Sequence, residues 1–142
     1  MARKTLTFTV QDEGRDKGKT FIITEMAASQ AEKWAIRAFL AMAQAGIQIP
    51  DEIAEMGFAG LAKIGLDSLA KLPYVQVEPL MDEMMRCVQI MPNPAQPGVV
   101  RALVEDDIEE ISTRIKLKPV ILQLHAGFSG AGSISTSAQP SA

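Results

Sequence analysis

Few side chains in this chain are of the types that do chemistry. His125 is its one histidine and Cys87 its one cysteine. A zinc-type metal site needs three or four converging ligands, and carboxylates would have to supply most of them here. A catalytic nucleophile needs a neighbouring base, and His125 is the single imidazole available. We therefore expect no catalytic residue, no metal and no cofactor, with His125 at a helix end and Cys87 as a buried thiol.

Acidic residues are the next candidates, because they crowd one stretch and could offer paired carboxylates. This acidic stretch comes before a basic one, which is the order that a helix dipole favours. The pattern predicts a helix over Val104–His125, kinked or divided at Pro119. The acids that would occupy its start are Glu105, Asp106, Asp107, Glu109 and Glu110.

Length and composition indicate the number of domains, the classes of partner and the cellular compartment. We expect the 142 residues to form one domain over residues 1–126, followed by a flexible Gly/Ser-rich tail over 127–142. A net charge of −3 disfavours nucleic-acid binding, and no apolar run approaches the roughly 20 residues that span a bilayer. The N-terminus lacks the apolar core of a signal peptide, and a single cysteine suits a reducing compartment, so we expect a cytoplasmic protein.

The sequence pattern of the helices and strands that would position these residues predicts an α+β fold that is mostly α. Thr5–Val10 alternates apolar and polar residues, and Lys19–Thr24 is rich in β-branched residues, so residues 5–24 should form a hairpin. The charged loop between the strands is interpreted as a solvated turn, although a binding role stays open. Two strands are marginal alone, so their apolar face should pack on helices or join a partner's sheet.

Four or five helices are expected over residues 26–126. The central one, over Glu25–Ile47, should start with a capping box at Ser29 and Glu32 and stop at Gly46. Its first apolar face should be structural core and includes Trp34, Ala38 and Met42. A second face carries Phe39 and Leu40.

Residues 50–73 should form one helix, or two helices broken near Gly57–Gly60. Together with the preceding helix, this stretch also permits a helix-turn-helix, but its acids and alanines suit DNA poorly.

A further helix is predicted to open at Pro79 and to place methionines at three- and four-residue steps through Met91. Methionine fills irregular cores, and it also serves adaptable binding surfaces, so both interpretations stay open. The proline-rich stretch that follows, over Pro92–Gly98, should be a stiff surface connector.

The chain resembles the tail assembly chaperones of long-tailed double-stranded DNA bacteriophages. The resemblance covers roughly Lys19 to Phe128 and is carried by T-F-I-I-T-E-M-A-A-S-Q-A-E-K-W-A-I-R-A, then G-I-Q-I-P, F-A-G-L-A and V-V-R-A-L-V-E-D-D-I-E-E-I. It implies a non-enzymatic protein of the host cytoplasm that binds the helical tape measure protein and keeps it soluble. It also implies absence from the finished virion, with the tail tube protein and a second copy of the chain as further candidate partners.

A client helix needs an apolar receiving surface. We expect it at Met81, Met84, Met85 and Val88, with Phe39 and Leu40 as a second candidate. Two other functions stay open: a structural virion subunit of the tail or head completion, and the helix-turn-helix DNA-binding protein.

Overall fold

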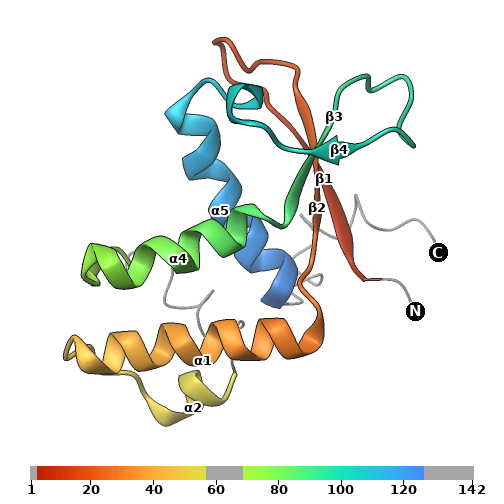
Figure 1. Ribbon diagram of the computed structural model, residues 1–142. Helices are drawn as coiled ribbons and strands as arrows, with labels where there is room; N and C mark the ends of the chain where they lie inside the picture. The colour runs from red at the N-terminus through yellow and green to blue at the C-terminus, as the bar shows by residue number, and fades with distance from the viewer. Residues whose placement is uncertain (1–2, 57–68, 127–142) are drawn as a thin grey trace.

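The computed structural model describes residues 3–56 and 69–126, and Figure 1 shows the arrangement of their helices and strands. The architecture is α+β, as predicted, with one antiparallel sheet and helices packed against it. The expected break near Gly57–Gly60 and the expected tail over 127–142 lie outside these ranges. Within the two ranges, no helix combines the length and the apolar character that crossing a membrane requires.

The predicted hairpin is present, but it is only half of the sheet. Strands β1 (Thr5–Thr9) and β2 (Thr20–Thr24) pair in antiparallel register. Strands β3 (Val88–Met91) and β4 (Arg101–Ala102) extend the sheet in the order β1-β2-β3-β4. The inner face is built from cross-strand rows, one of Leu6, Ile23 and Val88 and one of Phe8, Phe21 and Ile90.

Helix α1 (Ala28–Gln44), predicted to be covered on several sides, buries one face in the core and leaves Ile36 and Leu40 exposed. Trp34, Ala38 and Met42 are all fully buried, and the Trp34 Nε1–H donates to the carbonyl of Leu80 at 3.0 Å. The predicted stop is confirmed, because Gly46 follows the helix with a left-handed φ of +83°. The predicted capping box is wrong, since Ala27 is the N-cap residue and makes no side-chain cap.

Short elements lead from α1 to the second long helix. In the described part of this stretch they are α2 (Asp51–Glu55) and the 3-10 turn η1 (Leu69–Lys71), and α4 (Tyr74–Met85) follows. The predicted start of α4 at Pro79 is wrong, because the helix begins five residues earlier and Pro79 lies inside it. Its predicted continuation to Met91 is also wrong, because the chain leaves the helix after Met85 and Val88 enters a strand.

The last elements are the 3-10 turn η2 (Glu105–Asp107) and helix α5 (Ile111–Ala126). The predicted helix over Val104–His125 therefore starts later than expected, and all five acidic residues of the stretch precede it. Pro119 does not divide α5. Figure 1 shows α5 crossing the end of α4, with α1 on the far side of α4 from the sheet.

Candidate functional site

The charged loop between β1 and β2 is a structural anchor rather than a free turn. The Asp16 carboxylate is almost completely buried and accepts hydrogen bonds from the N–H groups of Glu109 and Glu110 at 2.9 Å each. The Thr113 hydroxyl donates to it at 2.7 Å and the Lys19 ammonium at 3.0 Å. Asp16 thus caps the start of α5 from a distant part of the chain, which fixes the loop to the helix.

The electrostatics of Asp16 follow from these donors. Burial alone would raise the pKa of Asp16, but the donors from Glu109, Thr113, Lys19 and Glu110 outweigh it and hold the pKa well below its usual range. Asp107 behaves similarly, since the Arg101 guanidinium donates to both of its oxygens at 2.8 Å and lowers its pKa. The acidic stretch is therefore used in part for internal hydrogen bonds and ion pairs.

The two residues first considered for catalysis have structural roles. The Nε2 atom of His125 accepts from the Met26 N–H at 2.7 Å, and its Nδ1 lies 2.9 Å from the Ile121 carbonyl. This pattern fixes the neutral tautomer with the proton on Nδ1. The Cys87 thiol is buried, and burial raises its pKa to about 11, so it stays protonated near neutral pH and is a poor nucleophile. Among the described residues, no three His, Cys, Asp or Glu side chains gather as metal ligands would.

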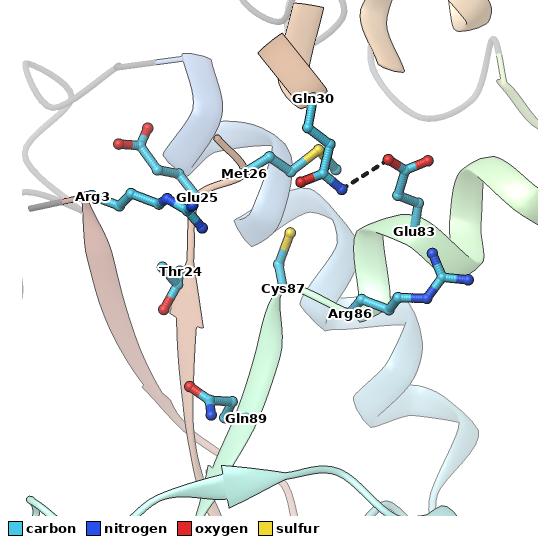
Figure 2. A pocket seen from close by; sticks show the side chains of 9 residues that line it. All are labelled: Arg3, Thr24, Glu25, Met26, Gln30, Glu83, Arg86, Cys87 and Gln89. Carbon is cyan, nitrogen blue, oxygen red and sulfur yellow. Dashed lines mark hydrogen bonds between the residues drawn. The ribbon is translucent and has the colours of Figure 1, made fainter. Parts of the chain in front are cut away.

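A polar cavity of about 320 Å³ lies beside Cys87, between the end of β2 and the end of α4. Figure 2 shows Gln30 of α1 reaching toward Glu83 of α4 across its upper side, and the two bond at 2.9 Å. Charges of both signs line it, with Arg3 and Arg86 against Glu25 and Glu83. Because the charges balance, this cavity has no clear preference for an anion or a cation.

A second and larger cavity, of about 470 Å³, is more apolar and is called the α4–β4 groove below. It lies between the end of α4, strand β4 and the start of α5. Its apolar lining consists of Met85, Val88, Ala102, Leu103, Val104 and Ile108. Its charged lining consists of Asp82, Arg86, Glu105 and Arg114.

The predicted methionine stripe is split by the turn between α4 and β3. Met84 is fully buried in the core, and Met81 is partly buried against it. Met85 and Val88 are also buried, at 8% and 3% exposure, but both contribute to the wall of the α4–β4 groove. The structure therefore brings two of the four predicted residues to one cavity and places the other two in or against the core.

The second predicted surface lies on α1, away from the groove. Phe39 packs against the core, whereas Leu40 is 60% exposed. Leu40 lies in line with Ile36 and Ala43, which are also exposed, at four- and three-residue steps on the outer side of α1. We call these three residues the α1 stripe. It is an exposed apolar line rather than a cavity.

The residues that sequence reasoning missed are those that β4 and η2 bring to the groove, above all Leu103, Val104 and Ile108. Val104 is 60% exposed at the rim. A signal was present in V-V-R-A-L-V, whose apolar and β-branched residues are typical of a strand, but only Val104 of this run was assigned to an element, as the start of the predicted helix over Val104–His125. Comparisons with protein-family models, with curated proteins and with solved structures find no match to this chain.

Proposed function

We propose that this protein is a non-catalytic tail assembly chaperone of a long-tailed phage. In this proposal it acts in the host cytoplasm, binds helical segments of the tape measure protein and keeps them soluble until the tail tube forms. The proposal rests on the resemblance described above and on one observation, the α4–β4 groove. The groove offers an apolar receiving surface on a molecule whose histidine and cysteine have structural roles.

The groove has the properties that a helical client requires. Its volume of about 470 Å³ is large enough to take in apolar side chains from one face of a helix. Met85 forms part of the wall, and an unbranched thioether adjusts to side chains of different shape. Since one chaperone must accept many segments of a long client, an adaptable wall suits this task better than a rigid one.

Charged residues that line the α4–β4 groove would orient a bound helix. Arg86 and Arg114 line the groove and form no ion pair with the described residues. Asp82 and Glu105 line it as well, so the rim presents both signs. An amphipathic helix carries charged residues of both signs beside its apolar face, and such a rim can pair with them.

Co-expression with the tape measure protein of the same genome tests the proposal. We expect the tape measure protein in the soluble fraction with this protein and in the insoluble fraction without it. An equally insoluble client in both cultures would contradict the proposal. Mass spectrometry of purified virions tests the alternative structural role, because a chaperone should be absent and a tail subunit should be present at high copy.

A further inference from the structure

Strand β1 is an open edge of the sheet. It pairs with β2 on one side, and no hydrogen bond from the described residues reaches its other side. The Glu25 N–H donates to the Lys4 carbonyl, and the Val10 N–H donates to the Lys19 carbonyl. The backbone groups of Lys4 and Val10 therefore point toward β2. Because backbone groups alternate along an antiparallel strand, the N–H and C=O groups of Thr5, Thr7 and Thr9 point to the open side.

The open edge lacks the usual protection against pairing. Natural edge strands commonly carry lysine, proline or a bulge that blocks a second strand. Thr5–Thr9 contains no charge and no proline, and its pairing with β2 is regular over all five residues. The opposite edge of the sheet is different, because β4 is only two residues long.

We propose that β1 is the interface with a second copy of this chain, through antiparallel β1–β1 pairing across a two-fold axis at Thr7. In this arrangement Thr7 lies opposite Thr7 of the partner subunit, and Thr5 lies opposite Thr9 of the partner subunit. Each opposed pair exchanges two hydrogen bonds. The two four-stranded sheets would then form one continuous sheet, which removes both open edges.

Charge complementarity favours a second copy over an unrelated strand. Arg3 and Lys4 precede β1, and neither side chain forms an ion pair with the described residues. Asp12 and Glu13 follow β1 by a few residues. Antiparallel pairing about Thr7 brings the basic end of each copy beside the acidic end of the other. Asp12 and Glu13 already bond Lys116 and Lys17 of their own chain, so they would be shared between two cations.

Sedimentation velocity of the full chain over a range of concentrations tests the interface. Wild type should show a concentration-dependent monomer–dimer equilibrium. Thr7→Lys places two like charges directly opposite each other and should raise the dimer Kd by roughly three- to tenfold. Thr7→Glu should do the same. Ser112→Lys, at an exposed position in the first turn of α5, is the matched control and should leave the Kd unchanged.

Mixing the two variants is the decisive step, because residue 7 meets itself only if the axis passes through it. An equimolar mixture of Thr7→Lys and Thr7→Glu should restore dimerisation at least to the wild-type level. A monomeric wild type at all concentrations, or a mixture no better than either variant, would overturn the inference. The result is independent of the proposed function, since the α4–β4 groove lies away from β1 and client binding is measured separately.

Discussion

At the scale of single residues, Trp34 is the largest fully buried side chain of the core. It packs within the cluster that α1 forms with the other helices, and its Nε1–H bonds the Leu80 carbonyl. Trp34→Ala removes a large apolar volume and the indole N–H that the Leu80 carbonyl accepts. We expect a loss of roughly 3–5 kcal/mol in the free energy of unfolding, measured by urea denaturation. An unchanged denaturation midpoint would show that the indole is not part of the core.

Asp16 should control the acid stability of the fold. The pKa of Asp16 is depressed in the native state. The carboxylate therefore adds to the free energy of unfolding above about pH 4, the pKa of an aspartate in the unfolded chain, and this stabilisation is lost as the pH falls below that value. Asp16→Asn removes the carboxylate that four donors share and should cost about 2–5 kcal/mol at neutral pH. The variant should also lose stability less steeply than wild type between about pH 4 and pH 2. Parallel acid denaturation curves for the two proteins would contradict this role.

His125 should control stability in a different pH range. Burial lowers its pKa, and its Nε2 can accept the Met26 N–H only while it is unprotonated. In the unfolded chain His125 is protonated near pH 6.5, whereas in the native state its protonation is disfavoured. The free energy of unfolding should therefore fall as the pH drops below about 6.5. Urea denaturation at pH 7.5 and pH 5.5 measures the effect. His125→Asn should be less stable than wild type at pH 7.5 but nearly independent of pH, and equal pH dependence in both proteins would argue against the assignment.

At the scale of secondary-structure elements, the two internal prolines are tolerated for a common reason. Each proline lacks the N–H that would bond the carbonyl four residues earlier. Those carbonyls belong to Val75 in α4 and Ile115 in α5, whose residues are 76% and 62% exposed. Water can satisfy a carbonyl on the solvent side of a helix, so Pro79 and Pro119 remain inside continuous helices.

Gly46 ends α1 for a conformational reason that a matched pair of variants can isolate. Neither Gly46 nor Gly98 has an atom within contact distance of an added Cβ, but only Gly46 has a left-handed φ. Gly46→Ala should therefore cost about 1–2 kcal/mol of unfolding free energy, from backbone strain alone. Gly98→Ala should be close to neutral. Thermal denaturation of both variants checks this. Equal melting temperatures would show that the left-handed φ at residue 46 does not destabilise an alanine there.

The elements that could be predicted from the sequence are those with one dominant local pattern. The β1–β2 hairpin and α1 have clear periods of two and about 3.6 residues, and both were predicted within a few residues. Val88–Met91 fits both periods, because Val88 and Ile90 alternate while Met84, Val88 and Met91 also recur at helical steps. Pairing with β2 decides between them, and that long-range contact leaves no local signal.

The candidate site was predictable only in part for the same reason. Met85 and Val88 were expected to share one helical face, and they do meet, but at a cavity formed where α4 ends and β3 begins. The opposite wall comes from residues 102–108, which β4 and the Asp107–Arg101 ion pair hold in place. The role of Asp16 as the distant cap of α5 could not be inferred from its place in a charged loop.

At the scale of the whole molecule, two separate surfaces remain for partners. The α4–β4 groove is the proposed site of a helical client, and the β1 edge is the proposed interface with a second copy of the chain. The α1 stripe provides a comparison for the first assignment, because it is exposed and apolar but is not hollowed. Ile36→Asp and Leu40→Asp together should leave client binding unchanged, whereas loss of binding in this double variant would move the client site to α1.

Direct binding of tape measure segments to this protein tests the central claim. Amphipathic segments of that protein, labelled with a fluorophore, are titrated with wild type, Val104→Asp and Val99→Asp, and anisotropy is measured. Both valines are exposed, at 60% and 55%, so neither change should unfold the chain, but only Val104 lines the groove. We predict that Val104→Asp weakens binding about tenfold or more, by placing a charge where apolar side chains enter, and that Val99→Asp binds as wild type does. Equal affinities for all three proteins, or no binding by wild type, would contradict the account.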